Sequence, residues 1–204
     1  MDQPAYQSGR YVMRPHVGWE RVDAFANRFG RQLVHSNERS RTDGVDGQSI
    51  WADGTGPAVH YIVDATAGIG YVVITGDDRS AAQRVEHEVV RDLQPWVLDE
   101  LLAAFDEAEE LRDRMQYVLR IGLAAPEGFD ENSFARISAG LSADDHRIRY
   151  AALWATTYTG YQEFVPVIES HLLVDGEEEF VQVRARSVLD SFRVVAGEQS
   201  GTTG

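Results

Sequence analysis

The feature that most constrains the fold is a change in the spacing of apolar residues near Ser80. In the segments just before Ser80, residues 57–64 and 69–75, these residues follow the two-residue period of a β-strand, and from Ser80 onward they follow the period of about 3.6 residues of an amphipathic helix. This change predicts a sheet followed by a set of helices, which is an α+β fold. We therefore expect an α+β domain over residues 1–79, a helical domain over 80–196 and a disordered tail over 197–204, where Gly, Ser and Thr predominate.

The first domain is predicted to contain an antiparallel sheet of three or four strands with one helix laid across it. Residues 57–64 and 69–75 are β-branched and aromatic runs separated by a short turn, so they predict a hairpin. Residues 49–52 predict a third strand, and residues 1–17 a tail or an edge strand. From Trp19 to Phe29 the apolar residues recur at helical spacing, which predicts the helix.

The helical domain is predicted to start with a helix at Ser80, which has the spacing of a capping box with Gln83. This helix should bury Ala81 on its apolar face and end before Pro95. Six further helices, joined by short turns, should form three antiparallel pairs. They are expected at residues 95–107, 109–123, 131–140, 144–158, 164–173 and 179–193.

The paired helices carry an internal repeat. Two similar stretches align Ile148 with Val183 and Arg149 with Arg184, at an offset of 35 residues, and the same offset backwards from Arg149 reaches Arg114. Periods of this length are typical of repeat architectures. The repeat predicts that a set of apolar residues is buried between the helices: Ile148, Ala152, Leu153, Val183, Val188 and Leu189.

The stretch from Ser142 to Leu153 has an acidic turn, then the aliphatic–Arg step Ile148-Arg149, then small residues. It resembles the second-helix signature of HEAT repeats. The resemblance covers residues 95–193, and the first pair departs most from it, with Asp113-Arg114-Met115 in place of the aliphatic–Arg step. It implies an α-solenoid whose second helices form a concave surface for protein or nucleic acid. The alternative is a plain six-helix bundle in which the spacing is coincidental.

Charge is distributed unevenly along the chain. Up to Asp92 there are 13 acidic and 10 basic residues, a net of −3, whereas from Leu93 onward there are 20 acidic and 9 basic residues, a net of −11. Such a field repels a phosphate backbone and attracts a basic protein, so we expect a basic protein partner and no direct contact with nucleic acid. The alternative is that the surplus carboxylates serve only solubility.

Composition excludes several classes of site and location. The chain has no cysteine, which excludes thiolate catalysis, zinc ribbons and disulfide scaffolds. The start of the sequence shows no secretion signal, and no apolar run is long enough to span a membrane, so a soluble, cytoplasmic protein is expected. The six histidines lack metal-binding spacing, and no metal, cofactor or catalytic residue is predicted. His60 is expected to be a packed histidine, and Glu86-His87-Glu88 a solvated surface.

Two acidic clusters and two tyrosines are the candidate partner-binding residues, because exposed tyrosine beside acid is typical of protein-recognition surfaces. They are Glu107, Glu110, Tyr158, Tyr161, Glu178 and Glu179.

The favoured hypothesis is a protein-binding module, most concretely a bacterial immunity protein that neutralises a basic toxin. An enzyme on a HEAT-like scaffold, of hydrolase or DNA-repair type, and an adaptor in a larger complex remain the alternatives.

Overall fold

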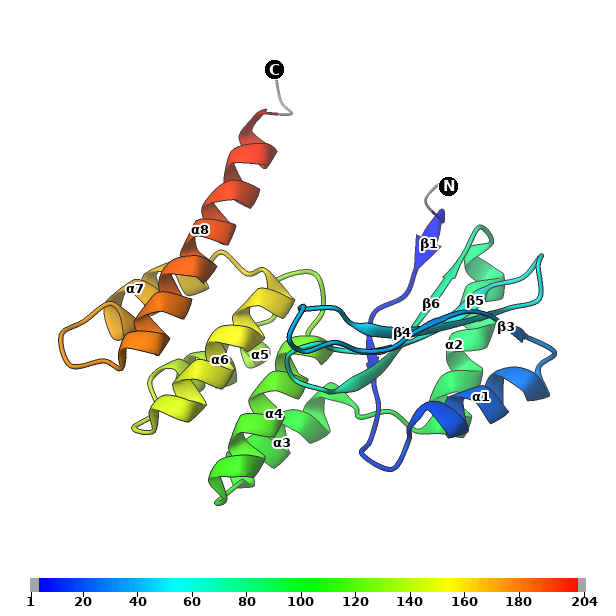
Figure 1. The fold of residues 1–204 in the computed structure, drawn as a ribbon, viewed down its shortest axis with the longest axis horizontal. Helices are drawn as coiled ribbons and strands as arrows, with labels where there is room; N and C mark the ends of the chain where they lie inside the picture. Colours follow the sequence, from blue (N-terminus) through cyan, green and yellow to red (C-terminus); the bar gives the residue numbers. More distant parts are fainter. Residues whose placement is uncertain (1–3, 202–204) are drawn as a thin grey trace. The chain divides into compact units, whose positions relative to one another are not determined.

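The computed structural model describes the backbone of residues 4–201 and the side chains of residues 4–194. The fold class is α+β as predicted, with an antiparallel sheet near the N-terminus and helices after it (Figure 1). The chain divides into two compact units, and the boundary lies after Val97 instead of before Ser80. The predicted boundary is displaced because α2 (Arg79–Leu93) packs into the core of the sheet-containing unit.

The sheet has six strands instead of the three or four predicted, and every pair of neighbours is antiparallel as expected. The strands are β1 (Tyr6–Gln7), β2 (Tyr11–Val12), β3 (Gln32–Asn37), β4 (Gly47–Ala52), β5 (Ala58–Val63) and β6 (Gly70–Gly76). Their order is β1-β6-β5-β4-β3, and β2 also pairs with β6. The predicted hairpin is confirmed as β5 and β6, and the N-terminal edge strand as β1 and β2.

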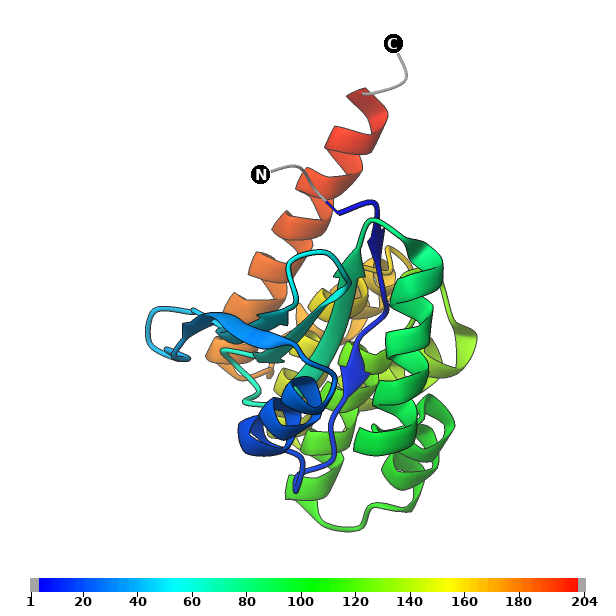
Figure 2. The same cartoon turned by 90° about the vertical axis from the view of Figure 1, so that its right-hand side faces the viewer.

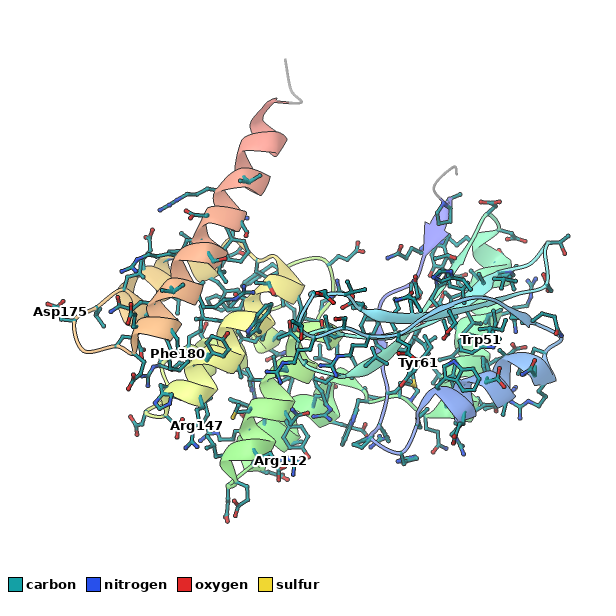
Figure 3. The ribbon with its side chains drawn as sticks, in the orientation of Figure 1. Trp51, Tyr61, Arg112, Arg147, Asp175 and Phe180 are labelled. Atoms are coloured by element: carbon teal, nitrogen blue, oxygen red, sulfur yellow. The ribbon has the colours of Figure 1, made fainter. Side chains whose placement is uncertain are left out.

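One face of the sheet and two helices form the core of the first unit. Helix α1 (Trp19–Arg28) and α2 contribute buried residues to it, and so do β4, β5 and β6. On the sheet, Trp51 is fully buried, and its Nε1 donates to the Asp23 carboxylate at 2.8 Å, which attaches β4 to α1. Figure 3 labels Trp51 and Tyr61, both of which belong to this core.

The start of α2 differs from the predicted capping box. The N-cap is Asp78, whose carboxylate accepts hydrogen bonds from the backbone N–H groups of Ser80 and Ala81, at 2.8 and 3.2 Å. Asp is as good an N-cap as Ser, and it precedes Ser80 at the point where the helix begins. Ala82 is buried together with Val85, Val89 and Leu93, so the predicted burial of Ala81 was wrong.

Strand β3 is the outer strand of the sheet, and all six of its residues are exposed. Its pairing with β4 contains a β-bulge, because Leu33 lies opposite Trp51 and His35 opposite Ile50, which leaves Val34 without a partner on β4. The sequence alone predicts only a short strand over residues 31–35, because QLVHSN has no strict alternation of apolar and polar residues.

The second unit consists of the six predicted helices in two layers. They are α3 (Leu98–Glu107), α4 (Leu111–Ala124), α5 (Glu131–Leu141), α6 (His146–Thr159), α7 (Phe164–Leu172) and α8 (Glu179–Gly201). Each first helix contacts the first helix of the next pair, and each second helix the next second helix. In Figure 1, α6 and α8 lie in front of α5 and α7.

The repeat in this unit has a period of 33 residues, not 35. Both the start of the first helix in each pair and the positions of the buried residues follow this period. Helices α3, α5 and α7 begin at Leu98, Glu131 and Phe164, which are 33 residues apart. Three sets of residues at this spacing are buried: Leu119, Ala152 and Ala185, then Gly122, Ala155 and Val188, then Ile148 and Val181.

Five of the six apolar residues that the 35-residue offset assigned to the core are buried, and Val183 is not. Val183 is 56% exposed, whereas Ile148, its supposed equivalent, is 7% exposed. The equivalent of Ile148 is Val181, because each is the third residue of its helix and is buried. The assignment of Val183 to the core was therefore wrong.

Small residues bring α4 and α6 close together. A Cβ atom added to Gly122 would lie 2.7 Å from both the Cα and the carbonyl oxygen of Ala155 on α6. Between α5 and α6, a Cβ atom added to Gly140 would lie 2.9 Å from the Cβ of Ala152. Because the neighbouring atoms at Gly122 belong to backbone, rotation of a side chain cannot relieve the overlap.

Replacing Gly122 by Ala is expected to lower the free energy of unfolding by about 1–3 kcal/mol, because α4 must move away from α6. Gly128 provides a matched control, since nothing lies within 4 Å of a Cβ added there. Denaturant melts of the two variants test the prediction. Equal stability of both variants would show that the helices do not touch at Gly122.

Helix α8 is longer than predicted. It continues beyond 193 to Gly201, so the predicted tail is helical over 197–201, and residues 202–204 lie outside the described part (Figures 1 and 2). A single glycine inside a helix costs only about 1 kcal/mol, and Ala, Glu and Gln nearby favour the helix. Among the described residues, no helix is both long enough and apolar enough to cross a membrane.

Candidate partner-binding surface

The structure separates the predicted acidic residues into two places. Glu107 ends α3 and Glu110 is the N-cap of α4, whereas Glu178 and Glu179 lie at the start of α8. All four side chains belong to exposed residues. Helix α6 packs between α4 and α8 in the second layer, so the two glutamate pairs do not form one cluster.

Tyr161 is not a surface residue, which corrects its assignment as a partner-binding residue. It is 4% exposed, its hydroxyl donates to the carbonyl of Pro126 at 2.8 Å, and its ring stacks on Phe164. Gly160 ends α6 in the left-handed conformation, with φ of 67°, and the chain after it turns Tyr161 into the core. Tyr158 is half-buried and remains a candidate.

A groove on the second-layer helices α6 and α8 is a candidate binding surface of this unit. Its volume is about 530 Å³, and its lining consists of Tyr150, Glu179, Phe180, Val183, Arg184 and Ser187. Phe180 is 46% exposed and Val183 is 56% exposed, although both are large apolar residues. Phe180 extends from the first turn of α8 toward α6, where it meets the rings of His146 and Tyr150 at 5.6 and 5.3 Å (Figure 3).

Arg184 forms the inner wall of the groove and connects α8 to α6. Its guanidinium carbon lies 3.3 Å from the centre of the Trp154 ring, a close cation–π contact. Burial lowers the pKa of the Arg184 guanidinium below its usual value, although the nearby Tyr150 and Tyr158 oppose this effect. The Nε of Arg184 and the Nε1 of Trp154 are buried without hydrogen-bond partners.

No protein-family model matches this chain, and no curated protein or solved structure is significantly similar to it. Any function must therefore be argued from the surface itself.

Arg149 has a structural role near this surface. It donates two hydrogen bonds of 2.6 Å to the Glu177 carboxylate, and two more of 2.7 Å to the carbonyls of Ala143 and Asp144. The Arg149 side chain is 17% exposed and that of Glu177 is 2% exposed. These bonds join the turn before α6 to the turn before α8. Glu177 is thus separated in role from Glu178 and Glu179, which face solvent.

Glu86 and His60 of the first unit are both partly buried. Glu86 accepts hydrogen bonds from the hydroxyls of Tyr6 and Tyr11, at 2.7 and 2.5 Å, so it is not the solvated residue that was predicted. His60 is half-buried, its Nε2 lies 2.8 Å from the Thr75 hydroxyl oxygen, and burial lowers its pKa. Within residues 4–194, no three His, Asp or Glu side chains gather as metal ligands would.

Only part of the groove could be predicted from the sequence. Glu179 was identified because it is an acidic residue in the helical half, whereas the other candidate, Tyr158, does not line the groove. Phe180 and Arg184 were missed, since both have helical spacing and were counted as repeat positions. A usable signal was present in the helical spacing of Phe180, Val183 and Arg184, which places all three on one side of α8.

Proposed function

We propose that this chain is a protein-binding module and that the groove of α6 and α8 is its interface. The observation that supports this is the exposure of Phe180 and Val183 beside Arg184, in a groove edged by Glu179. Exposed apolar residues with a polar rim mark interaction sites, and aromatic residues and arginine supply much of the binding energy at interfaces. The stacked helix pairs are proposed to be a HEAT-like scaffold that presents this surface.

The proposed partner is a basic protein. The helical unit carries 20 acidic and 9 basic residues, a net of −11. Such an excess accelerates the approach of a cationic protein and opposes nucleic acid. Neutralisation of a basic toxin is the most concrete form of this proposal, and an adaptor role would use the same surface.

The experiment is site-specific photo-cross-linking in the organism that encodes the chain. A photoreactive amino acid at Val183 should form one discrete adduct with a basic protein, and the adduct should disappear when Phe180 is also changed to Ser. The matched control is Val90, which is 49% exposed on α2 in the other unit. Equal adducts from both positions, or adducts that survive Phe180→Ser, would show that the groove is not the interface.

Once isolated, the partner allows the role of charge to be measured. Reversal of Glu178 and Glu179 to Arg is expected to reduce the association rate at low salt by about tenfold or more. Reversal of Glu107 and Glu110 changes the charge equally but away from the groove, so it should have a smaller effect. Identical rates for the two variants would mean that the acidic residues near the groove do not contact the partner.

A further inference from the structure

We infer that the groove contains a carboxylate-binding site centred on Arg184, and that it receives the C-terminal carboxylate of a partner chain whose last residue is apolar. This inference rests on the proposed function, because it specifies which part of the protein partner enters the groove.

The first argument is that Arg184 has no anionic partner. Among the described residues, no carboxylate forms an ion pair with it and no hydrogen bond satisfies its Nε. Arg149 on α6, by contrast, is paired with Glu177. A half-buried cation without a counter-ion is costly. A carboxylate from outside would supply the missing partner.

The second argument is that Arg184 is held in place. The guanidinium carbon lies 3.3 Å from the centre of the Trp154 ring, and this contact restrains the Arg184 side chain before any ligand arrives. A planar guanidinium offers two parallel N–H donors to a carboxylate, and less side-chain entropy is lost when the group is already ordered.

The third argument is the apolar wall next to this cation. Phe180 precedes Val183 by three residues and Arg184 by four, which places all three on one side of α8. An amino-acid residue at the end of a chain carries an apolar side chain and a carboxylate on the same Cα. It can therefore contact the apolar wall and the guanidinium together.

Glu179 determines the direction of the bound segment. It lines the same groove and lies five residues before Arg184, which is about 7.5 Å along the helix axis. A carboxylate placed there would be repelled, whereas a lysine or arginine upstream of the apolar residue would be attracted. The groove thus favours a segment with basic residues followed by an apolar C-terminal residue.

The test uses the synthetic peptide acetyl-Lys-Lys-Ala-Leu with a free C-terminal carboxylate, titrated into the full-length protein and followed by NMR. The signals of the Trp154 indole N–H and the Arg184 Nε–H should shift. A second peptide with a C-terminal amide should bind roughly tenfold more weakly, since it lacks the charge-assisted hydrogen bonds. A third, acetyl-Lys-Lys-Leu-Asp-amide, presents a side-chain carboxylate and should also bind weakly.

Arg184→Gln should abolish the difference between the free acid and the amide. Arg186→Gln is the matched control, because it removes one positive charge from an exposed position on the same helix and should leave the difference intact. Melting both variants shows whether each is folded. Arg184→Lys keeps the charge but loses the paired donors, so it should restore only part of the difference.

The inference is overturned if the acid and amide peptides bind equally to the unaltered protein, if neither binds, or if Arg186→Gln has the same effect as Arg184→Gln. If the aspartate peptide binds more tightly than the free-acid peptide, the groove receives a side-chain carboxylate and not the C-terminal carboxylate of a partner. These failures leave the proposed function intact when Val183 still gives its cross-link, whereas loss of that cross-link contradicts the proposed function itself.

Discussion

Replacing Arg149 by Leu is expected to lower the free energy of unfolding by about 3–5 kcal/mol, because it leaves the Glu177 carboxylate buried without a counter-ion. The Glu177 side chain is only 2% exposed, so water cannot replace the two lost hydrogen bonds. The turns before α6 and α8 would also lose their connection. Denaturant melts of the purified protein measure the effect.

Two variants serve as controls for Arg149→Leu. Arg147 pairs with Asp145, the N-cap of the same helix, but the two side chains are 55% and 30% exposed, so Arg147→Leu should lower the stability much less than Arg149→Leu. The double variant with Leu at both Arg149 and Glu177 removes both charges and should recover much of the lost stability. A double variant as unstable as the single one would mean that the ion pair is not the cause.

The same pair predicts how stability depends on pH. The Arg149 guanidinium lowers the pKa of Glu177 below its usual range, so the folded state holds a proton on this group less readily than the unfolded state. The resulting stabilisation is complete above the unfolded pKa of about 4.3 and is lost as the pH falls through the lower folded pKa. In Arg149→Leu this contribution should be absent from melts between pH 5 and pH 3.

Replacing Leu153 by Ala is expected to cost about 2–5 kcal/mol, because Leu153 is fully buried in α6 and its truncation leaves a cavity. Helix α6 packs against α4, α5 and α8, so the surrounding side chains cannot all move to fill the space. The control is Val183→Ala at a position that is 56% exposed, where a loss within about 0.5 kcal/mol is expected. Similar losses at both positions would contradict the assignment of Leu153 to the core.

Helix positions were predictable from the sequence because each helix buries one regular face. Turns with Gly or Pro marked most of the ends, and α3 to α7 lie within a few residues of their predicted bounds. The two-residue strands β1 and β2 could not be assigned individually, since so short a segment has no detectable period. Helix α2 was assigned to the wrong unit because its apolar face does not reveal which surface covers it.

The repeat shows why a matched motif can give the wrong register. Aligning Arg149 with Arg184 matched two residues of one type that have different roles, since the first pairs with Glu177 and the second stacks on Trp154. The buried residues follow a spacing of 33 instead. Contacts such as that between Arg184 and Trp154 join different helices, and no spacing within one helix predicts them. For the same reason Tyr161 could not be recognised as buried.

The bulge at Val34 affects whether the open edge of the sheet can pair with a strand from another copy of the protein. A straight edge strand offers a regular row of amide and carbonyl groups that a strand from another molecule can extend. In β3 this row is interrupted at Val34, and a bulge bends the strand and increases its twist. The opposite edge is formed by β1 and β2, which pair with β6 and have only two residues each. Growth of the sheet from molecule to molecule, the first step toward aggregation, is thus disfavoured at both edges, even though β3 exposes Leu33 and Val34 and carries no Asp, Glu or Arg.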